Sequence, residues 1–303
     1  MQDGSRKAII AAFFANLGIA LAKFAGFALT ASASMLAEAV HSVADTSNQG
    51  LLILGGRRSR RAATPMHPFG FGRERYFWSF IVALVIFSLG ALFALFEAEE
   101  KLRHPHEIES PLVAVAILGV AIVFESFSLR TAVHESRAVK GDASWWSFIR
   151  HSRGPELPVV LLEDLGALVG LAFALVGVVL ADVTGNARFD AVGSLAIGLL
   201  LAAIAIVLMI EMKSLLMGET ATEDTERTIR HAVERRPPVR RLIHMRTQHL
   251  GPEELLVCLK VELDGTLDAS TVVTAINDIE AEVRRAVPAA RIMYVEPDLH
   301  RST

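Results

Sequence analysis

Six long apolar segments constrain the fold of this chain more than any other feature of its sequence. Each has about 20 residues, the length of helix that crosses roughly 30 Å of hydrocarbon. Hydrophobic residues make up 52% of the 303 positions, which is high for a soluble domain and typical of a polytopic membrane protein. We therefore expect an α-helical polytopic membrane protein with six transmembrane helices. The segments cover residues 8–29, 34–56, 77–96, 111–129, 157–181 and 189–210.

The composition changes after Leu216, where charged residues become frequent. From there the pattern reads helix, strand, strand, helix, strand, and residues 255–263 alternate apolar with other side chains as a half-buried strand does. This order predicts two helices on one face of a three-stranded sheet. We expect two domains, a six-helix transmembrane domain over residues 1–217 and a small α/β domain over residues 218–303.

Basic residues mark one side of the predicted membrane domain. The first loop contains no lysine or arginine, and the third contains two among five glutamates, whereas the second and fourth loops are strongly basic. By the positive-inside rule, both termini and the even-numbered loops lie in the cytoplasm. The basic residues of the second and fourth loops are Arg57, Arg58, Arg60, Arg61, Arg73, Arg75, Arg137, Lys140, Arg150 and Arg153.

Charge and cysteine content exclude several classes of function. A formal net charge of −3 gives no indication of a nucleic-acid partner. The single cysteine, Cys258, excludes an intramolecular disulfide and a zinc site built from cysteines. The sequence contains neither a His-Glu-x-x-His motif nor a recognisable nucleophile–base pair, so an intramembrane metalloenzyme is disfavoured. We expect a protein that is not an enzyme.

The second apolar segment carries three polar residues at helical spacing. Asp45 lies four residues after His41, and Asn48 lies seven residues after His41, so a helix places all three on one face. An imidazole and a carboxylate inside a bilayer are costly, and such groups cluster on ion pathways. The alternative is that His41 is a hydrogen-bonded polar residue in a helix interface.

The fifth segment contains two adjacent carboxylates, Glu163 and Asp164. A buried carboxylate is usually paired, protonated or bound to a metal. Adjacent residues of a helix point about 100° apart, so one carboxylate can face a site while the other faces a different helix. Glu163 is either a ligand or a structural partner of Lys23 or of another helix. The small residues Gly166, Ala167 and Gly170 permit close helix approach beside the pair.

Together, these two helices offer one nitrogen and several oxygens: His41, Asp45, Asp164 and Glu163. This donor set suits a divalent transition metal such as Zn²⁺, Mn²⁺, Fe²⁺ or Co²⁺. Each of these donors also binds a proton, so metal and protons compete for the same atoms. Such competition is the physical requirement for metal–proton exchange.

The sequence resembles the cation diffusion facilitator family of metal exporters, and within that family its motifs are most similar to those of the branch that contains the zinc transporter nine-like proteins. The resemblance covers nearly the whole chain. Its specific parts are the stretch from His41 to Gln49 and the His-Pro-Phe-Gly loop beginning at His67. Asn16, residues 23–26, 164–170 and 190–198, and the tail from His244 to Asp298 add to it.

The resemblance implies a proton-driven exporter of Zn²⁺ or related ions, Cd²⁺ among them, that works as a homodimer. It also implies a cytoplasmic ferredoxin-like domain resembling metallochaperones. The family's transport site takes two ligands from the second segment and two from the fifth, and His41, Asp45 and Asp164 match three of these. The position of the fourth ligand is Val160, which cannot coordinate a metal, so Glu163 or water would complete the site.

Two further metal sites of the family depart from its pattern in this chain. The loop keeps His67, but Phe71 stands at the second histidine position and Thr64 at the acidic one, which predicts that this site is lost. In the tail, His244 matches one ligand of a dimer-bridging cluster. The other positions of that cluster hold Lys260, Tyr294 and Glu296. A positive charge in place of a ligand predicts that no zinc cluster forms there.

We therefore expect a proton-coupled divalent metal transporter that exports Zn²⁺ by alternating access, with H⁺ as counter-ion. The expected location is the plasma (inner) membrane of a bacterium, where the protein contacts the lipid bilayer as a homodimer. The alternative is a metal-binding membrane sensor or scaffold that does not transport. The missing fourth ligand at Val160 is the feature that supports this alternative.

Overall fold

The computed structural model describes residues 9–10, 13–14, 16–18, 20–22, 24–25, 28, 33–105 and 111–299, and side chains within these ranges except those of 33–42, 44–45, 85–87 and 113. The chain divides into two compact units. The first runs to Arg58 and continues over Arg75–Lys213. The second combines Ser59–Glu74 with the chain from Ser214 onward. The domain boundary expected at residue 217 stays a prediction.

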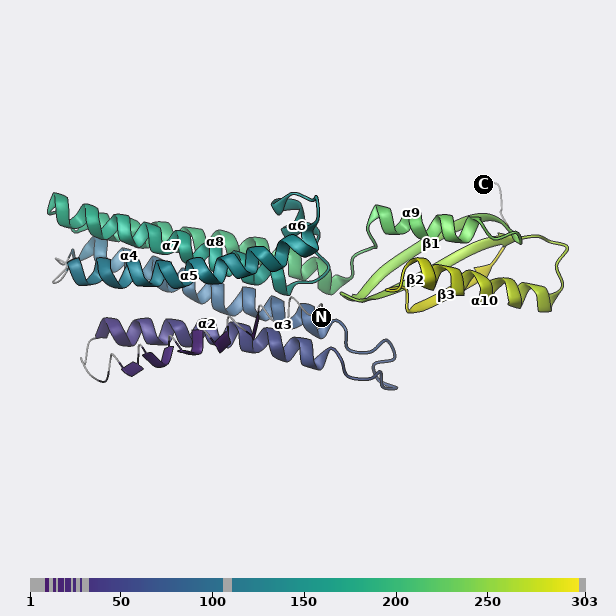
Figure 1. Cartoon of the computed structure of the whole chain (residues 1–303), viewed down its shortest axis with the longest axis horizontal. Coiled ribbons are helices and arrows are strands. Elements are labelled where there is room, and N and C mark those ends of the chain that lie inside the picture. Colours follow the sequence, from purple (N-terminus) through teal and green to yellow (C-terminus); the bar gives the residue numbers. More distant parts are fainter. Residues whose placement is uncertain are drawn as a thin grey trace. The chain divides into compact units, whose positions relative to one another are not determined.

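All regular secondary structure described in the first unit is helical. Helices α4, α5, α7 and α8 run side by side (Figure 1), and α7 also carries the two adjacent carboxylates. Its elements are α2 (Ala33–Arg58), α3 (Glu74–Ile81), the π-helix η1 (Val82–Phe87), α4 (Ser88–Arg103), α5 (Pro111–Lys140), α6 (Trp145–His151), α7 (Glu156–Thr184) and α8 (Arg188–Met217).

Four helical runs in the described ranges are long and apolar enough to cross a membrane. They correspond to the third to sixth segments expected from the sequence. The second expected segment lies within helix α2, and the first is described only in part, with gaps between its described residues. The six-span architecture therefore stays a prediction. The four runs are Glu74–Arg103, Ala114–Lys140, Glu156–Thr184 and Arg188–Met217.

Glycines allow α7 and α8 to approach closely. A Cβ atom at Gly177 would lie 3.1 Å from the carbonyl oxygen of Phe189, and one at Gly193 would lie 3.0 Å from that of Phe173. At Gly166 a Cβ atom would lie only 2.6 Å from Cδ1 of Ile204 on α8, so a larger residue would displace that side chain. Small residues therefore hold α7, and with it the carboxylates at 163 and 164, firmly against α8.

The second unit contains helices α9 (Glu223–Glu234) and α10 (Ala269–Ala286) and strands β1 (Val239–Gly251), β2 (Glu254–Leu263) and β3 (Ile292–Pro297). The order α-β-β-α-β confirms the pattern expected from the sequence. Strand β2 is central, antiparallel to β1 and parallel to β3.

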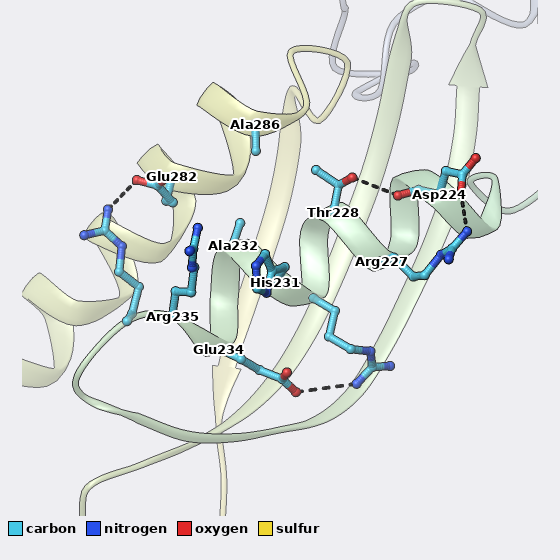
Figure 2. A pocket seen from close by; sticks show the side chains of 11 residues that line it. Asp224, Arg227, Thr228, His231, Ala232, Glu234, Arg235, Glu282 and Ala286 are labelled. Atoms are coloured by element: carbon cyan, nitrogen blue, oxygen red, sulfur yellow. Dashed lines mark hydrogen bonds and ion pairs between the residues drawn. The ribbon is translucent and has the colours of Figure 1, made fainter.

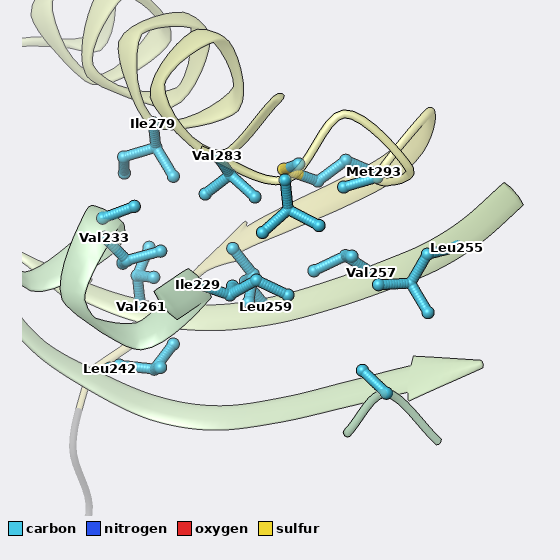
Figure 3. Packing of buried hydrophobic residues seen from close by; sticks show 14 of the residues in the cluster. Ile229, Val233, Leu242, Leu255, Val257, Leu259, Val261, Ile279, Val283 and Met293 are labelled. Atoms are coloured by element: carbon cyan, nitrogen blue, oxygen red, sulfur yellow. The ribbon is translucent and has the colours of Figure 1, made fainter. Parts of the chain in front are cut away.

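Both helices of this unit cover the same face of the sheet. Apolar side chains from α9 and α10 point toward one face of β2 (Figure 3), where every second residue is buried. The alternation seen in the sequence is therefore the pattern of a strand with one buried face. The core includes Ile229, Val233, Leu255, Val257, Leu259, Val261, Ile279 and Val283.

Candidate metal site

Helix α2 supplies the polar face on which the candidate site was predicted. Its helical backbone runs unbroken through positions 41, 45 and 48, which fall within an arc of about 60°. The side chains of His41 and Asp45 lie outside the described set, so their roles stay predictions. The side chain of Asn48 is described, and only 2% of this residue is exposed.

Glu163 lies against this polar part of α2. Its Oε1 atom accepts a hydrogen bond from Nδ2 of Asn48 at 3.1 Å and another from Nε2 of Gln49 at 3.0 Å. The Oε1 atom of Gln49 in turn accepts from Nδ2 of Asn16, with the two atoms 3.4 Å apart. Three segments of the helical unit are thus joined by two buried amide–carboxylate hydrogen bonds and one part-buried amide–amide hydrogen bond.

Asp164 lies on a different side of α7. Its Oδ2 atom accepts a hydrogen bond from the hydroxyl of Ser128 on α5 at 2.9 Å, and only 4% of Asp164 is exposed. The adjacent carboxylates therefore contact different helices, as the rotation of about 100° between neighbouring residues predicts. Glu163 contacts α2 and Asp164 contacts α5.

Val160 occupies the position one turn before Asp164. It is 1% exposed and belongs to the apolar core of the helical unit. The structure describes neither Lys23 nor the metal-site side chains of α2. In the described part of the chain, no three His, Cys, Asp or Glu residues lie close enough together to hold a metal ion.

Sequence reasoning missed Gln49 and Ser128 as partners of the two carboxylates. Gln49 directly follows Asn48, and its polar character inside an apolar segment was a usable signal. Ser128 gave no comparable signal, because a serine in a membrane helix commonly hydrogen-bonds its own backbone. Ser126 does so, donating to the carbonyl oxygen of Ile122.

The loop between α2 and α3 shows no described metal cluster around His67. The His67 ring stacks on Phe71 with 4.7 Å between ring centroids, and both backbone groups of His67 pair with Thr64. The aromatic residue at position 71 thus packs on the histidine where a second ligand would be needed.

In the tail, three positions at which the resemblance led us to expect metal ligands are cross-strand neighbours. His244 of β1 pairs with Lys260 of β2, and Lys260 pairs with Glu296 of β3. The ammonium of Lys260 lies 3.2 Å from Oε1 of Glu296 and 3.0 Å from Oδ2 of Asp298. Hydrogen bonds to Asp298 and Glu296 raise the pKa of Lys260 above its usual value, so the cation is retained at neutral pH.

A cleft of about 760 Å³ lies between α9 and α10 and is lined by several arginines (Figure 2). Three of these pair with acids: Arg227 with Asp224, Arg230 with Glu234, and Arg236 with Glu282. The lining charges largely neutralise one another, so the cleft carries little net charge to recognise an ion.

The chain matches a family model over most of its length and several relatives that are named as metal transporters. Residues 9–217 match the family model described as the cation efflux transmembrane domain. The chain is 35% identical over 265 residues to the human proton-coupled zinc antiporter SLC30A9, mitochondrial. The matched region covers 86% of this chain and 46% of that protein.

Two more distant relatives extend the comparison. Metal tolerance protein C4 of Arabidopsis thaliana is 28% identical over 265 residues, covering 87% of this chain and 58% of that protein. The zinc transporter ZitB of Escherichia coli is 25% identical over 257 residues, covering 84% of this chain and 77% of that protein. The chain spans about half the length of the SLC30A9 proteins that it matches.

Proposed function

This chain belongs to the cation efflux family, and from that membership we propose that it exports divalent metal cations, Zn²⁺ foremost, in exchange for protons. Relatives that match over most of the chain are named as a proton-coupled zinc antiporter and as a zinc transporter. These names favour transport over a sensor or scaffold that holds a metal without moving it.

One structural observation carries the proposal. The adjacent carboxylates of α7 are buried in an apolar helix, and each is hydrogen-bonded to a different neighbouring helix. Buried carboxylates are costly unless they bind a proton or a cation, so their place inside a candidate span indicates an ion pathway.

We assign the transport site to His41 and Asp45 of α2 and to Asp164 of α7, with Glu163 beside them. The imidazole supplies a nitrogen donor that titrates near neutral pH, and the carboxylates supply charge. Protons and metal compete for these atoms, so a proton gradient is able to drive metal release. Mn²⁺, Fe²⁺, Co²⁺ and Cd²⁺ suit similar donors and are secondary candidates.

The proposed architecture has six membrane-spanning helices, the first formed by residues 8–29 and the second by α2. Both termini face the cytoplasm by the distribution of basic residues in the loops. The tail from about residue 218 forms a ferredoxin-like cytoplasmic domain, and the protein works as a homodimer in a bacterial plasma membrane. Relatives named as mitochondrial make the organelle membrane the alternative location.

Reconstitution in sealed vesicles tests this function. Vesicles with the wild-type protein should accumulate Zn²⁺ when a pH gradient is imposed, and this uptake should stop when the gradient is collapsed. The extent to which added Mn²⁺ inhibits Zn²⁺ uptake reports the metal preference. Asp45→Asn and Asp164→Asn should abolish uptake. Asp182→Asn, which changes an exposed acid near the other end of α7, is the matched control. Absence of gradient-driven uptake by the wild type would overturn the proposal.

The role of Glu163 is tested separately. Glu163→Gln keeps an oxygen that can accept from Asn48 and Gln49 but removes the charge. We expect this variant to bind Zn²⁺ more weakly than the wild type but more tightly than Asp164→Asn. We also expect the pH profile of its transport to differ from that of the wild type. A variant that matches the wild type in both respects would assign Glu163 a structural role and leave the fourth coordination position to another donor.

A further inference from the structure

We propose that Asn48 is a ligand of the transported metal ion through its Oδ1 atom, and that Glu163 fixes the orientation of this ligand. The inference rests on the proposed transport function and deepens it. It assigns an oxygen donor to the site whose fourth protein ligand is missing at Val160.

The hydrogen bond to Glu163 fixes which way the Asn48 amide points. An ionised carboxylate only accepts hydrogen bonds, so the NH₂ group of Asn48 must face Oε1 of Glu163, as the 3.1 Å contact shows. The amide oxygen then points away from that carboxylate. It is fully buried and receives no hydrogen bond from any group that the structure describes. A buried amide oxygen without a donor is costly, which indicates that a cation or another group occupies this direction.

The position of Asn48 on α2 matches the proposed site. Residues three apart on a helix have Cβ atoms about 5–6 Å from each other, so positions 45 and 48 can serve one ion. Gln49 is the informative contrast. It donates to the same oxygen of Glu163, but its own Oε1 atom already accepts from Asn16. Of these two neighbouring amide oxygens, only that of Asn48 has no hydrogen-bond partner among the described groups.

The charge balance favours an amide as the additional donor. Asp45, Asp164, neutral His41 and neutral Asn48 would balance the two positive charges of the ion. With Glu163 as the additional ligand, the ligand set itself would carry a net negative charge, whereas the Glu163 carboxylate already accepts hydrogen bonds from the amides of Asn48 and Gln49. A carbonyl oxygen also makes the donor set harder, so discrimination of Zn²⁺ against Mn²⁺ should be weaker than with a second nitrogen ligand.

Metal binding to the purified full-length protein tests this assignment. Binding of Zn²⁺ and of Mn²⁺ is measured by titration calorimetry in detergent for the wild type, Asn48→Leu, Asn48→Asp and Gln49→Leu. Asn48→Leu is nearly isosteric and should weaken Zn²⁺ binding about tenfold or more. Asn48→Asp keeps an oxygen donor and should bind Zn²⁺ at least as tightly as the wild type at neutral pH. Gln49→Leu, which also removes one donor to Glu163, should change the affinity less than about threefold.

The outcomes separate this inference from the proposed function. Equal losses in Asn48→Leu and Gln49→Leu would show that Asn48 only orients Glu163, and unchanged affinity in Asn48→Leu would also overturn the assignment. If Asn48→Leu fails to fold, weak binding by well-folded Asn48→Asp overturns it instead. Failure of the wild type to transport Zn²⁺ in vesicles would count against the proposed function, whichever result the variants give.

Discussion

The guanidinium of Arg75 and the carboxylate of Glu156 form a buried two-point ion pair that joins α3 to the first turn of α7. One contact, between Nη2 and Oε2, measures 2.8 Å, and a second joins Nε to Oε1. Side-chain exposure is 6% for Arg75 and 3% for Glu156. Removing only one partner of such a pair is strongly destabilising, because the charge of the other partner is left buried.

Glu156→Gln should therefore lower the stability of the helical unit by about 3–5 kcal/mol. The measurement is thermal unfolding of the detergent-solubilised protein, scored by the apparent midpoint. Glu99→Gln is the control, since the Arg103–Glu99 pair is largely exposed and should contribute no more than about 1 kcal/mol. Equal shifts of the unfolding midpoint in the two variants would show that the buried pair contributes no more to stability than the exposed pair.

Local patterns in the sequence predicted the three strands and most of the long helices but not their contacts. The alternation in β2 identified both the strand and its buried face, because side-chain direction in a strand depends on sequence position alone. The apolar segment expected over residues 111–129 covers only the first part of α5. Hydropathy falls after that segment, yet the helix continues to Lys140 until Gly141 adopts a φ of 56°.

The partners of the two carboxylates could not be predicted from local patterns. Whether Asp164 meets Ser128 or another hydroxyl depends on how α5 packs on α7, and this pairing is a tertiary property. The rotation between adjacent helical residues did predict that Glu163 and Asp164 would face different neighbours. The π-helical turn at Val82–Phe87 likewise had no signal in the sequence.

The hydroxyl of Ser128 should act as a positioning group for Asp164. Ser128→Ala removes the 2.9 Å hydrogen bond that helps to orient the Asp164 carboxylate, so Zn²⁺ binding should weaken by about tenfold, as when the partner of a metal ligand is removed. The measurement is the Zn²⁺ dependence of uptake into vesicles, read as a rise in KM. Ser126→Ala is the matched control on the same helix, because that hydroxyl bonds only to its own backbone at Ile122 among the contacts described. Similar KM values for the two variants would contradict the assigned role.

Asp264 should make the stability of the tail depend on pH in the acid range. Hydrogen bonds from the hydroxyl and the backbone N–H of Thr266, aided by the guanidinium of Arg240, lower the pKa of Asp264 to about 2. Since the folded pKa lies below the ordinary 3.8, the stabilisation is complete above that value and is lost as pH falls toward 2.

Asp264→Ala should therefore lower the urea midpoint of a tail fragment at neutral pH, and the difference from wild type should shrink as pH falls from 3.8 toward 2. The fragment starts at Ser214 and carries its own hydrophobic core. Asp278→Ala, at an exposed position on α10, should leave the midpoint almost unchanged at every pH. A difference between Asp264→Ala and wild type that does not vary with pH would contradict the linkage.

The final prediction concerns Lys260, which stands at a position where the resemblance led us to expect a metal ligand. It contacts Glu296 and Asp298, and His244 is its cross-strand neighbour on β1. The wild-type tail should bind no zinc, because a bound cation would meet this positive charge. Lys260→His removes the charge and adds a nitrogen donor next to His244 and Glu296, so zinc binding should appear with a gain of at least about tenfold, or about 1.4 kcal/mol. Calorimetric titration of the tail fragment measures zinc binding by the wild type and by Lys260→His. Lys260→Ala is the control, because it removes the charge without adding a donor. Stoichiometric zinc binding by the wild type, or equal binding by the two variants, would show that Lys260 does not determine whether the sheet holds a metal.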